Sequence, residues 1–217
     1  MLTLRVGALS VAVSLVPGIL IGWLLARWES PLRALVQGMV MLPLVLPPVV
    51  TGYLLLRVFG RGGPLGAAYE AITGGRIAFT TMACVIAAAV VGFPLLVESI
   101  RLSVLGVDKR LEQTSRTLGR GRFGTFLRVT LPLSLPGIVG GSVLTFARSL
   151  GEFGATIILA GDIEGETRTI PIAVYSALNA VDGEAAVWRF VAVSVALSLA
   201  ALMLAFAFMS WQRRRLA

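Results

Sequence analysis

Long apolar blocks, separated by short charged segments, dominate the pattern of the chain. Five blocks are long enough to cross the roughly 30 Å hydrocarbon core of a bilayer as helices. They cover Leu2–Ala26, Ala34–Phe59, Ile77–Ile100, Leu131–Leu150 and Val187–Trp211. Because strand-like alternation of polar and apolar residues is missing, helices must satisfy the backbone hydrogen bonds in lipid. The pattern therefore predicts an all-α polytopic membrane protein with a single domain over residues 1–217.

Two shorter apolar stretches lie between the fourth and fifth blocks. Phe153–Ala160 is too short to cross a bilayer, so we interpret it as a re-entrant or broken continuation of the fourth span. Ile170–Leu178 is similar and predicts a short helix at membrane depth. The first block lacks the basic leader and the short core of a signal peptide, so we expect it to be the first span.

Composition excludes a soluble globular domain. Only 14% of the residues are charged and 57% are hydrophobic, whereas a soluble domain of this length would be about a quarter charged. The chain has no histidine and a single cysteine, Cys84, so neither a disulfide framework nor a zinc or copper site is expected. The formal charge of +8 comes from basic residues that flank apolar spans, which indicates membrane orientation rather than a nucleic-acid partner.

The distribution of basic residues predicts the orientation in the inner cell membrane. The loop 101–128 carries seven of them: Arg101, Lys109, Arg110, Arg116, Arg120, Arg122 and Arg128. The positive-inside rule places this loop and the basic C-terminal tail, Gln212–Arg215, in the cytoplasm. Counting spans backwards then puts the N-terminus outside. Arg57, Arg61 and Arg76 also fall outside, a mild violation that the larger cluster outweighs.

The basic loop contains a candidate amphipathic helix, Glu112–Gly119. Leu111, Ser115 and Leu118 share one face at i, i+4 and i+7, and Glu112 lies four residues before Arg116, which supports a helix. Gly119 is suited to end it. A solvated basic loop without a fixed partner is the alternative interpretation.

The residues after this helix resemble the coupling loop of ABC importer permeases. That signature is Glu-Ala-Ala, three residues, Gly, nine residues and Ile-x-Leu-Pro, and here Gly119 precedes Val129-Thr130-Leu131-Pro132 by nine residues. In register, the first half falls on Gln113-Thr114-Ser115, with Glu112 one place away from the expected acid. The resemblance implies that the loop helix docks in a cleft of a separate ATPase subunit. The coupling residues it implies are Gln113, Thr114, Ser115, Leu118, Gly119, Leu131 and Pro132.

Three further stretches narrow this resemblance. Leu42–Tyr53 is similar to the second-span motif of molybdate permeases, Phe146–Thr156 to a motif of sulfate and molybdate permeases, and Gly161–Pro171 to the molybdate branch. The resemblance implies a permease of the type I ABC importer fold that works as a homodimer with two ATPase subunits and an external substrate-binding protein. ATP and Mg²⁺ would bind to the ATPase, and this chain would hold no cofactor. The implied function is import of molybdate by alternating access, with tungstate or sulfate as alternatives.

Prolines predict a broken second span. Pro43, Pro47 and Pro48 each remove a backbone donor, which lipid tolerates only where protein or a wet cavity satisfies the freed carbonyls. A broken helix that lines a pathway and a simple packing kink both fit. Thr51 and Tyr53 could offer hydroxyl groups to an oxyanion.

Charges and small residues mark the fourth span. Arg148 and Glu152 lie four apart at membrane depth, where a structural ion pair is favoured over an Arg148 that attracts an anion. Gly140-Gly141 and Ser142 suit close helix packing. The candidates for the translocation path are Pro47, Pro48, Thr51, Tyr53, Ser142, Thr145, Arg148 and Ser149.

The sequence contains no phosphate-binding loop of the P-loop type. Its one lysine, Lys109, is followed by Arg110 rather than by Ser or Thr, so the chain is not expected to be an enzyme and ATP hydrolysis would require another chain. A secondary anion transporter is a different class, but such carriers usually keep acids or histidines inside their spans. Here Glu98 and Glu152 lie near span ends. A membrane scaffold without transport activity is a third class.

Overall fold

The computed structural model describes residues 1–180 and 183–216, and over these residues the chain forms helices and connecting turns without a strand. The helices are α1 (Leu2–Arg27), α2 (Leu32–Val45), α3 (Pro48–Phe59), α4 (Pro64–Thr73), α5 (Thr81–Leu105), α6 (Lys109–Thr117), α7 (Arg122–Thr125), a π-helical turn η1 (Phe126–Thr130), α8 (Leu131–Leu133), α9 (Leu135–Leu150), α10 (Gly154–Ala160), α11 (Ile170–Leu178) and α12 (Glu184–Leu216). The all-α prediction is confirmed.

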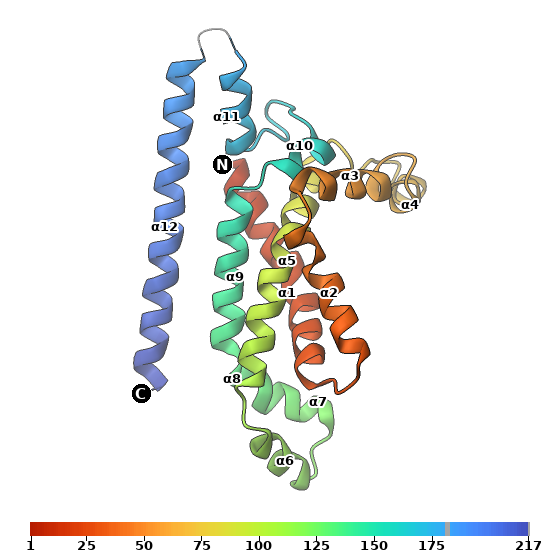
Figure 1. Ribbon diagram of the computed structural model, residues 1–217, viewed down its shortest axis with the longest axis vertical. Coiled ribbons are helices and arrows are strands. Elements are labelled where there is room, and N and C mark those ends of the chain that lie inside the picture. Colours follow the sequence, from red (N-terminus) through yellow and green to blue (C-terminus); the bar gives the residue numbers. More distant parts are fainter. Residues whose placement is uncertain (181–182, 217) are drawn as a thin grey trace.

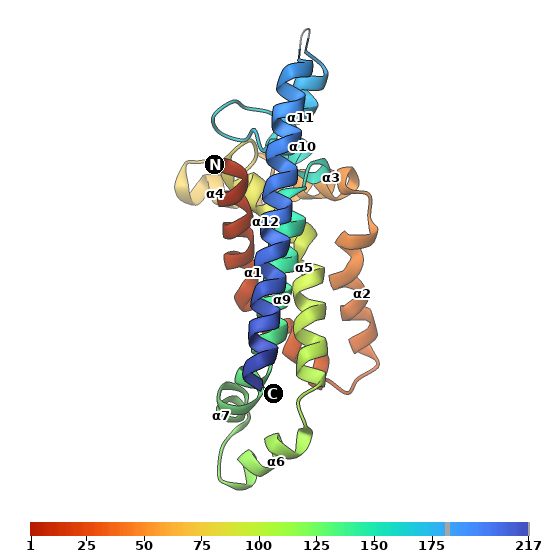
Figure 2. The same ribbon diagram turned by 90° about the vertical axis from the view of Figure 1, so that its left-hand side faces the viewer.

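Three helices, α1, α5 and α12, are individually long and apolar enough to cross a membrane. Two bent pairs, α2 with α3 and the 122–133 segment with α9, bring the candidate spans to five, in the regions that the apolar blocks predicted. α1, α2, α5, α9 and α12 run along the long axis of the molecule, with α6 and α7 at one end and α3, α4, α10 and α11 toward the other (Figure 1). We call these the α6 end and the α4 end. The N-terminus lies near the α4 end, and α12 runs back toward the α6 end (Figure 2).

The second predicted span is broken into two helices whose axes differ by 112°. Pro47 is extended (ψ 132°), and Pro48 occupies the first turn of α3, where its missing N–H costs nothing. The new direction follows from contact with α10, because a Cβ on Gly52 would lie 2.8 Å from the carbonyl oxygen of Ala155. At 14 residues, α2 is only about 21 Å long, shorter than the hydrocarbon core.

The third predicted span begins later than expected, at Thr81 instead of Ile77. Phe79 has a positive φ of 61°, and Thr80 is extended, with φ −132° and ψ 169°. Neither conformation is helical, so α5 cannot start before Thr81. The helix then continues to Leu105, past the predicted end.

Small residues pack α1, α5 and α9 into the rigid centre of the molecule. A Cβ on Gly18 would lie 2.7 Å from the Leu96 side chain, and one on Gly22 would lie 2.8 Å from Ile100. Gly141 of α9 approaches α5 in the same way, whereas the nearest atom to a Cβ on Gly140 is 3.9 Å away. Such contacts let helices approach closely in lipid. By contrast, α2 has no buried residue.

Candidate functional site

The predicted docking helix exists as α6, slightly earlier in the chain than expected. Asp108 caps it, because its carboxylate accepts a hydrogen bond of 2.9 Å from the backbone N–H of Arg110. At the other end, Gly119 adopts the left-handed conformation with φ +84°. A Cβ there would meet nothing within 4 Å, so the requirement for glycine comes from the backbone alone. The chain turns at Gly119 toward α7.

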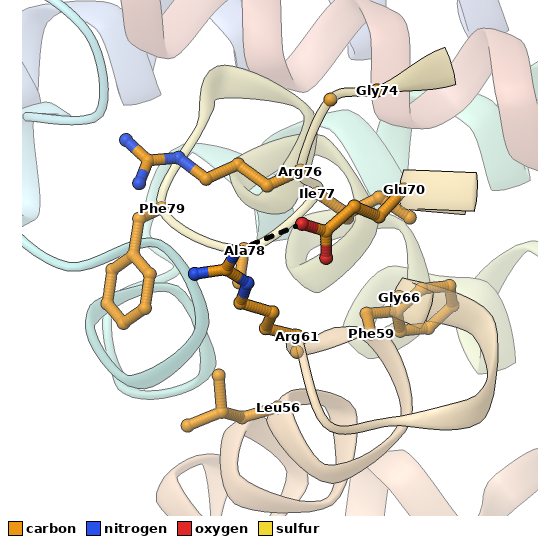
Figure 3. Close-up of a pocket in the computed structure, with 12 residues that line it drawn as sticks. Leu56, Phe59, Arg61, Gly66, Glu70, Gly74, Arg76, Ile77, Ala78 and Phe79 are labelled. Atoms are coloured by element: carbon orange, nitrogen blue, oxygen red, sulfur yellow. Dashed lines mark ion pairs between the residues drawn. The ribbon is translucent and has the colours of Figure 1, made fainter. Parts of the chain in front are cut away.

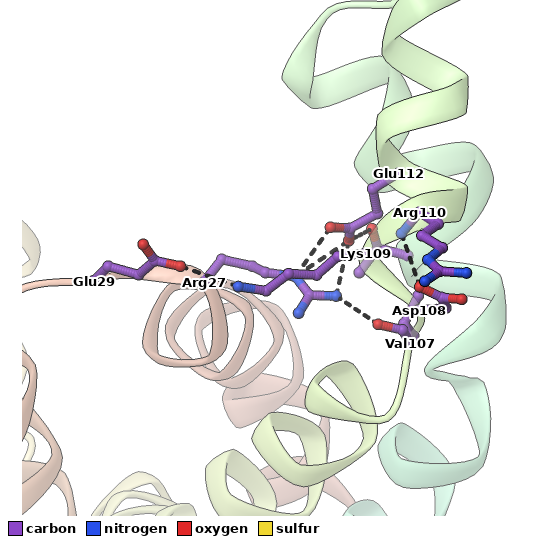
Figure 4. Close-up of polar contacts among 8 residues, drawn as sticks. Arg27, Glu29, Val107, Asp108, Lys109, Arg110 and Glu112 are labelled. Carbon is purple, nitrogen blue, oxygen red and sulfur yellow. Dashed lines mark hydrogen bonds and ion pairs between the residues drawn. The ribbon is translucent and has the colours of Figure 1, made fainter.

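Glu112 attaches α6 to the rest of the protein (Figure 4). Its carboxylate forms an ion pair with Arg27, the last residue of α1, with Nε–Oε2 3.1 Å and Nη2–Oε1 3.1 Å. The same carboxylate accepts a bond of 2.5 Å from the hydroxyl of Thr130. Arg27 also donates to the carbonyl of Val107, at 3.1 Å. We call Arg27, Glu112 and Thr130 the α1–α6 latch. The intrahelical pair of Glu112 with Arg116 that the spacing suggested is absent from the described residues.

The face of α6 that the latch leaves open is largely exposed. Gln113, Thr114, Leu118 and Gly119 are exposed, with Leu118 at 76%. Ser115 differs, because it is buried and accepts a hydrogen bond of 3.2 Å from Thr125 of α7.

Leu111, Ser115 and Leu118 lie on one face of α6, as predicted, but they differ in exposure. The serine holds α6 inward, and the two leucines project outward. All three residues line a pocket of about 420 Å³. Pro132 borders the same pocket, and Leu131 packs instead on the core around α5.

Serine and threonine candidates on α9 lie inside the protomer. Thr145 is fully buried and donates to the carbonyl of Gly92 on α5, at 3.2 Å. Ser149 donates to the Thr145 carbonyl and lies 3.0 Å from the hydroxyl of Ser10 on α1. Ser142 donates to the carbonyl one turn before it. The hydroxyls of Thr145 and Ser149 join α9 to α5 and α1, whereas that of the half-buried Ser142 bonds within α9; a role of the three in the path stays a prediction.

The candidates at the break differ in exposure. Pro47 and Pro48 are exposed, and Tyr53 is 55% exposed. Thr51 is 4% exposed, and its hydroxyl has no hydrogen-bond partner among the described residues. An unsatisfied buried hydroxyl is uncommon, because it carries a desolvation cost.

Arg148 and Glu152 form the ion pair that their spacing suggested, with Nη1–Oε2 2.9 Å. The carboxylate is almost completely buried and also accepts a bond of 2.9 Å from the backbone N–H of Ala155. Glu152 therefore joins the end of α9 to the start of α10, which is the element against which α3 packs.

A basic pocket of about 540 Å³ opens at the α4 end (Figure 3). Arg61 lies 3.3 Å from Glu70, and Arg76 and Phe79 also line the pocket. The positive φ of Phe79 is rare for an aromatic residue, and its N–H donates to the carbonyl of Leu159 on α10. The pocket presents two guanidinium groups at the end opposite α6.

An acidic loop, 161–169, lies beside α10 and α11 at the same end. Arg168 pairs with Asp162, Nε–Oδ1 2.7 Å, and the hydroxyl of Ser176 donates to the same carboxylate. Burial alone would raise the pKa of Asp162, but the hydrogen bonds from Arg168 and Ser176 together outweigh burial and lower it. Among the described residues, no three acidic or cysteine side chains gather to hold a metal ion.

Sequence reasoning missed Arg27 as a functional residue. In the sequence, Arg27 is visible only as a cation that directly follows the first apolar block. The positive-inside rule explains a cation at this position without a specific partner. Glu112 was noticed for its offset from the acid of the coupling signature and for its spacing of four from Arg116. The residue 85 positions away that completes its environment cannot be found from local spacing.

Comparison with known proteins identifies the family of the chain. Residues 18–217 match the family described as "Binding-protein-dependent transport system inner membrane component". The molybdenum transport system permease protein ModB of Escherichia coli K12 is 50% identical over 204 residues, which cover 94% of this chain and 89% of that protein. ModB of Haemophilus influenzae is 45% identical over 215 residues, 99% of this chain and 92% of the relative.

Solved structures share the fold at low sequence identity. A bacterial ABC transporter involved in the import of alginate superposes with a TM-score of 0.64 and 18% identity, covering 99% of this chain and 77% of that one. The same transporter type in complex with an alginate-bound periplasmic protein gives a TM-score of 0.67 and 17% identity over the same shares. The predicted permease fold is thereby confirmed. This chain belongs to the family of binding-protein-dependent transport system inner membrane components.

Proposed function

We propose that this chain is the membrane-spanning permease subunit of an ATP-driven molybdate importer. The observation that carries the proposal is α6, a helix displayed at one end with Gln113, Thr114 and Leu118 exposed while Glu112 fixes its inner side. A helix that is attached on one side and open on the other suits a docking element for a partner protein. The substrate class is supported by relatives named as molybdenum permeases at 45–50% identity over nearly the whole chain.

The proposed assembly contains two copies of this chain, two ATPase subunits and an external substrate-binding protein. ATP and Mg²⁺ bind to the ATPase subunits, and this chain supplies the path and no cofactor. Its exposed α2, which buries no residue within the protomer, leaves apolar surface for a second copy or for lipid. Closure of the ATPases displaces α6, and the latch passes this displacement to α1.

The proposed orientation places the α6 end in the cytoplasm and the N-terminus outside. Seven basic residues in the 101–128 segment support it through the positive-inside rule. The α4 end, with its acidic 161–169 loop and the pocket around Arg61 and Arg76, then faces the binding protein. Arginines at this end are useful for pairing with acidic side chains of such a partner.

Uptake by the reconstituted complex tests the proposal. The chain, its ATPase and its binding protein are placed in proteoliposomes that enclose ATP, and uptake of labelled molybdate is followed. We expect uptake that needs ATP and the binding protein, that excess tungstate inhibits, and that sulfate leaves nearly unchanged. Molybdate uptake without ATP would show a secondary transporter, and ATP-driven sulfate uptake that molybdate does not inhibit would show a different substrate.

A further inference from the structure

A second pocket lies at the α6 end, between the end of α1, α6 and α7, beside the latch. Its volume is about 410 Å³, and the residues that define its character are Trp23, Arg27, Trp28, Lys109, Arg116 and Arg122. The docking proposal assigns no role to this cavity, because the coupling residues other than Gln113 lie outside it.

The pocket carries free positive charge. Arg27 is engaged by Glu112, and Lys109 pairs with Glu29 at 3.0 Å (Figure 4). The two remaining cations, Arg116 on α6 and Arg122 on α7, are exposed and form no ion pair within residues 1–180 and 183–216. A phosphate group would complement this excess of two charges.

An apolar surface leads away from the pocket along α1. Val16, Leu20 and Leu24 follow at intervals of four residues and are 65%, 51% and 44% exposed. Leu24 also lines the pocket, and the indoles of Trp23 and Trp28 flank it where the apolar span ends. Tryptophan at the end of a span is typical of the headgroup level of a membrane. This combination fits a molecule with a charged head and apolar tails better than a free anion.

We propose that this pocket binds the headgroup of an anionic phospholipid. Arg116 and Arg122 hold the phosphate, the indoles of Trp23 and Trp28 contact the glycerol region, and the acyl chains follow Leu24 and the helix face beyond it. Because the pocket wall contains both ends of the α1–α6 latch, a bound lipid holds α6 at a fixed angle to α1.

Lipid retention by the full-length purified chain tests the site. The protein is exchanged into detergent with equal amounts of phosphatidylglycerol and phosphatidylcholine, and bound lipid is counted by native mass spectrometry. We expect the wild type to retain phosphatidylglycerol selectively. The double variant Arg116→Gln/Arg122→Gln should lose this retention by roughly 30-fold, since each cation near an anionic headgroup contributes about a factor of five. The matched variant Arg110→Gln/Arg120→Gln removes the same charge outside the pocket and should retain lipid normally.

Each other outcome overturns the proposal. Equal retention of phosphatidylglycerol and phosphatidylcholine by the wild type would show that the pocket does not select an anionic headgroup. Equal loss in both double variants would show a general charge effect. Displacement of the lipid by millimolar inorganic phosphate would show a free-anion site. Loss of ATPase binding by Arg116→Gln/Arg122→Gln in phosphatidylcholine alone would show that the two arginines contact protein instead.

Discussion

The α1–α6 latch predicts how firmly the docking helix is attached. The side chains of Arg27 and Glu112 are only 15% and 7% exposed, so solvent screens their attraction weakly. Arg27→Leu leaves the carboxylate with the Thr130 hydroxyl, and Glu112→Leu leaves the guanidinium with the Val107 carbonyl. Removing one member of a buried pair costs about 3 kcal/mol at the lower end of the usual range. The population of detached α6 should then rise by roughly 150-fold.

Hydrogen exchange of the α6 amides, residues 109–117, measures this population in nanodiscs. The α6 amides of each single variant should exchange roughly 150-fold faster than those of the wild type, because the exchange rate follows the population of the locally opened state. The double variant Arg27→Leu/Glu112→Leu should be no worse than either single change, since neither charge is then left unpaired. Lys109→Met is the control, because the neighbouring pair Lys109–Glu29 is 60% and 81% exposed and should matter little.

Two results would refute the reasoning about the latch. If the double variant showed the sum of the two single effects, the side chains would act independently and the ion pair would not hold α6. If Lys109→Met accelerated exchange as much as Glu112→Leu, then loss of local charge in general, rather than the buried pair, would be responsible.

Three further predictions follow from the site. Gly119→Val places a side chain on left-handed backbone, which costs about 1–2 kcal/mol, and it should weaken ATPase co-purification and coupled uptake about tenfold. Gly121→Val is the control and should have little effect, because Gly121 has a φ of −66° and equally open space around it. Labelling of Gln113→Cys on a Cys84→Ala background with a membrane-impermeant maleimide measures on which side of the membrane the exposed α6 lies. The cysteine should stay unlabelled in intact cells and be labelled in inside-out vesicles. Labelling in intact cells would contradict the proposed topology. Glu152→Leu should lower the thermal unfolding temperature in detergent, because it leaves the partly exposed Arg148 without its partner and the Ala155 N–H without its acceptor; an unchanged temperature would contradict this.

The positions of the helices could be predicted because lipid imposes a simple rule on sequence. An apolar run of sufficient length must be helical, and the five blocks have that length. The break at Pro47 and Pro48 was also visible, since two adjacent prolines cannot continue a helix ladder. The 112° turn was not visible, because it depends on α10 packing against Gly52, about a hundred residues away in the sequence.

The candidate site was predictable only where its chemistry is local. Gly119 was found because a glycine after an amphipathic segment signals a helix end. Its φ of +84° is the left-handed conformation that is common just after the last residue of a helix. Arg116 was taken as the partner of Glu112, because a sequence shows directly only the pairings between residues three or four apart on one helix. In the folded chain Glu112 pairs with Arg27 instead, because the turn at Asp108 brings the start of α6 next to the end of α1. The carboxylate and the guanidinium are buried together there.

The packing explains how movement of α6 could reach the opposite end of the molecule. Arg27 ends α1, and Gly18 and Gly22 interlock the same helix with Leu96 and Ile100 of α5. Because these glycines leave no room even for a methyl group, the two helices are closely packed, and we expect α1 and α5 to move together. α9 joins this unit through Gly141, and its far end carries the carboxylate that fixes the start of α10. α10 in turn supports the bent α3. We therefore expect displacement of the docking helix to reach α3 through this packed unit, while α2, which has no fully buried residue and is joined to α3 at the proline break, is held less firmly.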